Sequence, residues 1–206
     1  MAEIIQGSDE WKLLRLGIPT ASRMGDLMAR TKSGYGASRD NYMAELLVER
    51  LTGQPTVFGF VNDSMRWGTE HEDEAASAYA FYRDVVCEKI TFVRHPELES
   101  GASPDRLVGD EGMVEIKCPN TATHIETLLG AEVANKYYLQ MQWQMECTGR
   151  KWCDFASYDP RLPEHLRLIV KRVLRDDKKI EEMAGEVSRF MQEMMTKLLQ
   201  LEKLFI

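Results

Sequence analysis

Apolar residues recur along the chain with two different periods, and each period predicts a different kind of element. Spacings of three and four residues predict helices, whereas strict alternation predicts strands. Helices are expected over residues 8–17, from residue 22 onward, and over 38–52, 64–83, 135–148 and 176–203. Strands are expected over residues 88–94, 105–108, 113–118, 151–158 and 166–174. Ser8 and Ser38 are suited to cap helices and Gly53 to end one, while the Gly- and Ser-rich residues 31–38 predict a flexible loop.

This order of elements indicates one fold class. Helices come first, then a small sheet interrupted by one helix, then a long terminal helix, which is typical of an α/β or α+β protein. We expect a single domain over residues 1–206, with a helical part at 1–60, a core at 61–175 and the C-terminal helix at 176–206.

Composition adds few constraints. The chain has 206 residues, of which 44% are hydrophobic and 29% charged, as in ordinary globular proteins. No apolar run has bilayer length and the first residues are too acidic for a signal peptide, so we expect no membrane span and a cytoplasmic location. The four cysteines lack the spacing of a zinc site and are expected to be reduced, partly buried thiols.

The net charge of −7 argues against a protein that coats nucleic acid with a uniformly basic surface. The surplus is local, because residues 61–110 contain 11 acidic and 5 basic residues. These carboxylates form either a solvated acidic face or a functional cluster. Composition alone favours the solvated face.

The most informative pattern is Ser103-Pro104-Asp105 followed by Glu115-Ile116-Lys117. Glu115 and Lys117 lie two apart on a strand and therefore project to the same face. If the preceding segment folds back as a hairpin, Asp105 comes alongside them. Two carboxylates suit a hard divalent cation and an ammonium group suits a scissile phosphate, but a surface strand with crossed charges gives the same short pattern.

A second signal lies in the helix over residues 64–83. Glu72 shares one helix face with Ala75, Ala76 and Tyr79, so its carboxylate is expected to point toward the core. That is costly unless the group is paired or bound to metal, and a salt bridge at the helix end is the plainer interpretation. Glu70, Asp73 and Glu74 are interpreted as solvated charges.

Several separated motifs resemble, in order, those of the lambda-type phage exonucleases, the viral recombinase exonuclease family. They are Gly7 through Ser22, Trp67-Gly-x-x-x-Glu72, Ser103-Pro-Asp105, Glu115-Ile-Lys117-Cys-Pro and Gln140-Met-Gln142, and Tyr158-Asp-Pro-Arg161 also fits. The resemblance runs from about residue 6 to residue 175. It implies a restriction-endonuclease-like α/β core of the PD-(D/E)xK kind, with a small mixed sheet flanked by helices, that digests one strand of duplex DNA from its 5′ end.

The resemblance also implies the site residues. Glu72, Asp105 and Glu115, with the backbone carbonyl of Ile116, would bind two Mg²⁺ ions, for which Mn²⁺ can substitute, and Lys117 would position or activate the attacking water. Residues matching those that hold the 5′-terminal phosphate are Arg15, Ser22, Ser103 and Gln140. Met65 matches an apolar wedge at the terminal base pair, although core packing explains a methionine equally well.

Family members form homotrimeric rings and usually work with a single-strand annealing protein, so both are expected partners besides double-stranded DNA ends. The terminal helix carries an apolar stripe from Ile180 to Leu201. At about 1.5 Å per residue it spans about 40 Å. We interpret the stripe first as ordinary packing and second as a docking surface.

Three other functions remain open. A resolvase-like nuclease could use the same core. An iron–sulfur nuclease would need clustered thiolates, which the scattered cysteines do not provide. A catalytically inactive scaffold that binds DNA ends is the third, and the intact set of Asp105, Glu115 and Lys117 argues against it.

Overall fold

The computed structural model describes residues 4–32, 34–56 and 63–205, and most of the predicted elements appear in it in the predicted order. The helices are α1 (Asp9–Leu14), α2 (Met24–Leu27), α3 (Ala37–Thr52), α4 (Asp63–Arg83), α5 (Thr121–Leu128), α6 (Asn135–Thr148) and α7 (Asp177–Glu202), with 3-10 turns η1 (Ala21–Arg23), η2 (Glu164–Leu166) and η3 (Lys203–Phe205). The strands are β1 (Arg30–Thr31), β2 (Gly34–Tyr35), β3 (Cys87–Glu88), β4 (Val93–Arg94), β5 (Gly101–Ala102), β6 (Arg106–Val108), β7 (Gly112–Lys117), β8 (Trp152–Tyr158) and β9 (Leu168–Leu174).

A mixed five-stranded sheet forms the centre, in the order β3-β6-β7-β8-β9. Strands β7 and β8 are parallel, and the chain between them forms α5 and α6, while the other neighbours are antiparallel. Gly112 lies opposite Trp152 in this parallel pair, and a Cβ at that glycine would come within 2.0 Å of the indole ring. The close approach therefore requires glycine at the start of β7.

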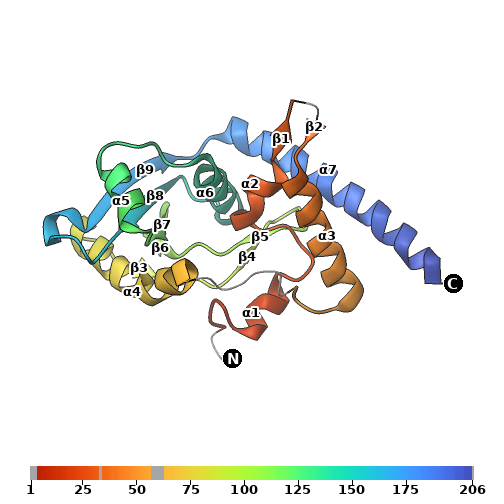
Figure 1. Cartoon of the computed structure of the whole chain (residues 1–206), viewed down its shortest axis with the longest axis horizontal. Helices are drawn as coiled ribbons and strands as arrows, with labels where there is room; N and C mark the ends of the chain where they lie inside the picture. Colours follow the sequence, from red (N-terminus) through yellow and green to blue (C-terminus); the bar gives the residue numbers. More distant parts are fainter. Residues whose placement is uncertain (1–3, 33, 57–62, 206) are drawn as a thin grey trace.

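Alternation along β7 divides its side chains between two layers. Val114 and Ile116 pack with Ala75 and Tyr79 of α4, whereas Met113 packs with Met141 of α6. Helices α4 and α6 therefore cover opposite faces of the sheet (Figure 1). The expected small mixed sheet flanked by helices is confirmed.

The largest core lies beyond this sheet, where α7 joins α2, α3 and α6. The stripe of α7 is buried there, with Met183, Val187, Phe190 and Met194 fully enclosed. The interpretation of this stripe as ordinary packing is confirmed for these residues. Figure 1 shows that the C-terminal part of α7 extends past the other helices.

Several local predictions are confirmed. The Ser8 hydroxyl accepts from the backbone N–H of Trp11 at 3.2 Å, which caps α1, and Gly53 ends α3 in the left-handed conformation. All four cysteines are free thiols. No helix of the described ranges has both the length and the apolar character to cross a membrane.

Other local predictions are wrong. Helix α3 begins one residue before Ser38 and has no side-chain cap, and β1 pairs antiparallel with β2 where only a flexible loop was expected. The strand expected over residues 88–94 is divided between β3 and β4, which belong to different sheets. The carbonyls of Ile90 and Thr91 accept side-chain hydrogen bonds from Gln6 and Trp11, so these residues are bound to the N-terminal segment and do not continue a strand. Helix α5, capped by Asn120, was not predicted.

Candidate active site

The hairpin of β6 and β7 brings Asp105 beside the Glu115-Ile116-Lys117 segment. The register pairs Arg106 with Val114, which places the residue before β6 next to the end of β7. Asp105 Oδ2 accepts the backbone N–H of Ile116 at 2.6 Å. The expected hairpin is confirmed, and this bond fixes the Asp105 carboxyl at the edge where β7 ends.

Glu115 and Lys117 project together from β7, as alternation predicts. The Glu115 carboxylate is 1% exposed and accepts a hydrogen bond from Lys117 Nζ. Burial alone would lower the pKa of Lys117, but the charges of Glu115 and Asp105 outweigh it and raise that pKa. The ammonium group, which lies 5.2 Å from the centre of the Tyr137 ring, is therefore held in its protonated form.

Two amides of α6 complete the surroundings of Glu115. Gln140 Nε2 donates to Glu115 Oε1 and Gln144 Nε2 donates to Oε2, each at 2.6 Å. The structure thus places Gln140, expected at the phosphate, against the Glu115 carboxylate. Gln144 was not singled out from the sequence, although its position one helical turn after Gln140 is a signal for it.

Asp105 is electrostatically strained within this cluster. Its burial and the neighbouring charges of Glu115 and Glu72 raise the pKa of Asp105 well above its usual range. A divalent cation would relieve this repulsion, and carboxylate oxygens are the ligands that a hard cation prefers. The chemistry of the donors therefore fits Mg²⁺ at Asp105 and Glu115.

Glu72 lies close by but has a different partner. It comes from α4, on the opposite face of the sheet from Gln140, and its Oε1 accepts from Arg106 Nη1 at 2.9 Å. In the described part of the chain, no three side chains of His, Cys, Asp or Glu are close enough together to hold a metal ion. Glu72 would have to turn away from Arg106 to join Asp105 and Glu115.

Arg106 also binds the residue after Glu72. Asp73 accepts from Arg106 and pairs with Lys89 at 2.9 Å, and Glu74 accepts from the Tyr158 hydroxyl at 2.8 Å. Asp73 and Glu74 are both exposed, as expected for solvated charges, and each also has a partner within the protein. A single sequence gives no sign of these contacts because Lys89 and Arg106 belong to other elements.

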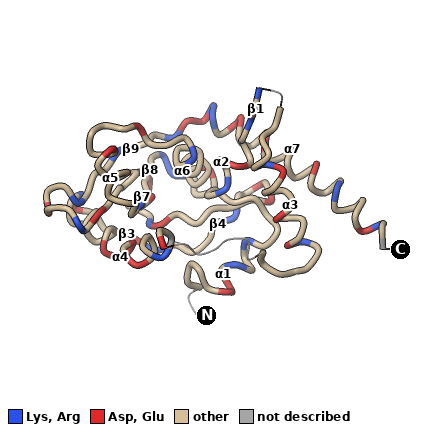
Figure 2. The backbone as a smooth tube through the Cα atoms, in the orientation of Figure 1, with Lys and Arg blue, Asp and Glu red and all other residues tan. Residues whose placement is uncertain are grey.

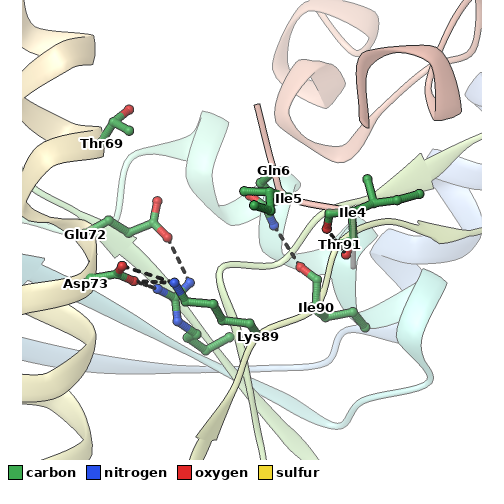
Figure 3. A pocket seen from close by; sticks show the side chains of 10 residues that line it. Ile4, Ile5, Gln6, Thr69, Glu72, Asp73, Lys89, Ile90 and Thr91 are labelled. Carbon is green, nitrogen blue, oxygen red and sulfur yellow. Dashed lines mark hydrogen bonds and ion pairs between the residues drawn. The ribbon is translucent and has the colours of Figure 1, made fainter. Parts of the chain in front are cut away.

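A pocket of about 370 Å³ opens beside this ion-pair cluster. Figure 3 shows Glu72 and Asp73 on one side of it, joined by dashed lines to basic groups, and Gln6, Ile90 and Thr91 on the other. The Gln6 amide donates to the Ile90 carbonyl at 3.0 Å, which holds the N-terminal segment against this wall. The pocket thus lies next to Glu72 and is lined by both polar and apolar groups.

Three of the four predicted phosphate residues, Arg15, Ser22 and Ser103, are connected through Thr20 and Trp11. Arg15 donates to the Thr20 hydroxyl at 2.9 Å, and that hydroxyl lies 3.5 Å from the exposed Ser22. Trp11 stacks under the Arg15 guanidinium at 4.2 Å and donates to the Ser103 hydroxyl at 2.9 Å. Because burial lowers the pKa of Arg15, an anion beside this guanidinium would offset the cost of its desolvation. Trp11 and Thr20 are the positioning residues that the sequence did not reveal.

The Tyr158-to-Arg161 motif contacts both the segment after β7 and α4. Asp159 accepts from Arg161 at 2.7 Å and from Thr121 at 2.7 Å, and Arg161 also donates to the carbonyl of Pro119. The guanidinium then covers the Trp67 ring at 4.4 Å. The motif therefore ties the segment after β7 to α4. Met65 belongs to α4, but its side chain lies outside the described residues.

Comparison with solved structures identifies the class. An alkaline exonuclease, LHK-Exo from Laribacter hongkongensis, is 46% identical over 95% of this chain and 97% of its own, with a TM-score of 0.88. The same protein in complex with dAMP gives the same values. A phage-related exonuclease from Haemophilus somnus 129PT has a TM-score of 0.73 over 89% of this chain and 96% of its own, and at 17% identity it supports the fold alone. Comparison with curated proteins finds no match.

The mixed sheet, its acidic cluster with a lysine and these likenesses define the protein as an exonuclease. The model of the YqaJ-like viral recombinase domain matches residues 10–151. The chain belongs to this family, which confirms the resemblance inferred from the motifs and gives the protein a nuclease role in recombination.

Proposed function

We propose that this protein is a Mg²⁺-dependent exonuclease that digests one strand of linear double-stranded DNA from its 5′ end. The products would be mononucleotides and a 3′ single-stranded overhang, for phage-type single-strand-annealing recombination. The observation that carries the proposal is the cluster of Asp105, buried Glu115 and Lys117, where β6 begins and β7 ends, in a chain of this family.

Glu72, Asp105, Glu115 and the Ile116 carbonyl would hold two Mg²⁺ ions. The bound cations would supply positive charge to the phosphate oxygens as negative charge develops on them. The hydrogen bond that holds the Asp105 carboxyl at the backbone of Ile116, next to Glu115, supports this assignment, because it brings carboxylate oxygens from two elements to the same edge of the sheet. Glu72 would exchange its bond to Arg106 for a cation.

Hydrolysis requires water to attack the phosphorus that follows the terminal nucleotide. A new P–O bond forms, the bond from phosphorus to the O3′ of the terminal nucleotide breaks, and O3′ leaves with a proton. Lys117 would position or activate this water, because its Nζ lies at the Glu115 carboxylate, and its positive charge would also suit the phosphate.

Recognition of the end would come from Arg15, Ser22, Ser103 and Gln140, which would bind the 5′-terminal phosphate. Arg15 offers a planar fork of donors for its oxygens. Because Gln140 lies against Glu115, it would connect the phosphate to the reacting centre. Met65 would insert at the terminal base pair as an apolar wedge.

A homotrimeric ring, an annealing-protein partner and action in the cytoplasm of a bacterial host are part of the same proposal. Light scattering on the purified protein measures the assembly directly. The expected mass is about 71 kDa, three times the 23.7 kDa of one chain. A monomer of unchanged activity would contradict the ring.

End-labelled duplexes test the activity. With Mg²⁺, the protein should release labelled mononucleotides from 5′-phosphorylated linear duplex and leave closed circular duplex intact. Release from 3′ ends, or efficient cutting of closed circles, would contradict the proposal and favour another nuclease on the same core. Binding of ends without any hydrolysis would indicate an inactive scaffold.

A further inference from the structure

Gln144 holds the second oxygen of a proposed metal ligand. It lies on α6 one turn after Gln140, and the residue is buried, with 1% of its surface exposed. Its Nε2 donates to Glu115 Oε2 at 2.6 Å, while Gln140 Nε2 donates to Oε1 at the same distance. The two amides therefore clamp one carboxylate from the same helix face.

The donors are distributed unequally between the two carboxylate oxygens. An ionised carboxylate only accepts hydrogen bonds, with about two lone-pair sites on each oxygen. Oε1 of Glu115 receives both Lys117 and Gln140, whereas Gln144 is the donor that the described residues give to Oε2. Oε2 is therefore the oxygen with room for a cation, and Gln144 is the group that fixes its position.

The orientation of the Gln144 amide supports this role. Its Oε1 is buried and has no hydrogen-bond partner among the described residues. Turning the amide over would place that oxygen against the Glu115 carboxylate, and two acceptors repel. The hydrogen bond to Glu115 therefore fixes the orientation of the Gln144 amide, although its Oε1 is left without a partner among the described residues.

We infer that Gln144 is a positioning residue for divalent-cation binding, which acts by fixing Glu115 Oε2 for the cation. The inference rests on the proposed function, because it assumes that Glu115 is a metal ligand. Groups that orient a metal ligand typically change metal affinity by about 10- to 100-fold when they are removed. Gln144 is therefore expected to influence metal affinity without contacting DNA.

Gln142 provides a matched control on the same helix. It is fully buried, but its amide binds the Leu174 carbonyl at 2.9 Å and the backbone N–H of Asp176 at 2.9 Å, away from Glu115. Gln144→Met and Gln142→Met remove the same polar group with nearly the same side-chain length. A purely structural effect would appear in both variants.

The test measures binding of Mn²⁺ alone, by the EPR signal of the free ion, to full-length protein without DNA. Gln144→Met is expected to bind Mn²⁺ about 10- to 100-fold more weakly than wild type, and Gln142→Met to bind within about threefold of it. Equal affinity of wild type and Gln144→Met, or an equal loss in both variants, would overturn the inference alone. Wild-type protein that binds no Mn²⁺ would overturn the proposed metal site and the inference with it. Should Gln144→Met fail to fold, Gln144→Asn replaces it, because the shorter amide cannot reach Oε2 and should give the same loss.

Discussion

The guanidinium of Arg15 is held in place before any DNA arrives, which makes it a sharp test of the phosphate site. Its Nη2 bonds to Thr20 at 2.9 Å, and the Trp11 ring supports its face at 4.2 Å. In the Arg15→Ala variant, the adjacent hydroxyls of Ser22 and Ser103 remain. We therefore expect this variant to bind DNA ends but to lose most of its preference for a 5′-phosphate over a 5′-hydroxyl.

The size of the effect follows from the chemistry of the lost contact. A hydrogen bond to a charged group contributes about 1.5–3 kcal/mol. Ser22 is exposed, so water competes at this site and the lower part of that range applies. A loss of about 1.5–2 kcal/mol corresponds to a fall of about 10- to 30-fold in the ratio of kcat/KM for the two kinds of end.

Steady-state rates on otherwise identical duplexes with 5′-phosphate or 5′-hydroxyl ends measure this ratio. Arg189→Ala serves as the control, because it removes a half-exposed cation of α7 whose partners are Glu186 and Tyr35. Trp11→Phe keeps a ring under Arg15 but loses the bond to Ser103, and a fall of about threefold is expected from one neutral hydrogen bond. An unchanged ratio in Arg15→Ala, with hydrolysis intact, would refute the assignment and place the phosphate elsewhere.

Further predictions concern the reaction and the stability of the fold. Lys117→Ala should abolish turnover while DNA still binds in Ca²⁺, as measured by a mobility shift; near-normal rates would show that another group orients the water. Removing divalent cations with EDTA should stop hydrolysis, and added Mg²⁺ should restore it, whereas activity that persists in EDTA would exclude the metal mechanism. Phe190→Ala should lower the free energy of unfolding by about 3–5 kcal/mol in urea, because the ring is fully buried where α7 meets the core; a change below about 1 kcal/mol would mean that α7 is a docking element. Hydrogen bonds from Arg161 and Thr121 outweigh burial and lower the pKa of Asp159 from 3.8 to about 2. The ionised form of Asp159 therefore contributes about 2 kcal/mol of stability above pH 4, and this contribution is lost as the pH falls toward 2. The difference in Tm between wild type and Asp159→Asn should shrink over that range. A constant difference would contradict the linkage.

The sequence predicted those parts of the fold that depend on local periodicity. Helix α6 was predicted with its observed ends, and β7 to within a residue at each end, because each has a clear period and a Gly or Pro nearby. The segment from Lys89 to Phe92 has the alternation of a strand but not its pairing. Its carbonyls are bound by Gln6 and Trp11, which lie about 80 residues earlier, and such distant side-chain contacts leave no local pattern.

The site was predictable to the same degree. Asp105 could be placed beside Glu115 because a hairpin has simple register rules, and the structure confirms the arrangement. The amide clamp from Gln144 and the stacking of Trp11 on Arg15 depend on how α6 and α1 dock, which a single sequence does not specify. The motifs identified the family, but the groups that orient the motif residues emerge from tertiary packing.

Part of the acidic surplus of residues 61–110 is paired with basic side chains. Alternation along β7 puts Glu115 on the α6 face of the sheet, while Glu72 comes from α4 on the opposite face. Asp105, directly before β6, lies at the sheet edge between these two carboxylates. Arg106 points to the α4 face, opposite Val114, where it neutralises Glu72 and Asp73. Figure 2 shows basic and acidic positions interspersed along the backbone. Because many of these carboxylates are paired with Arg or Lys, a net charge of −7 does not prevent the protein from admitting DNA at a local site where donors such as Arg15 face the phosphate.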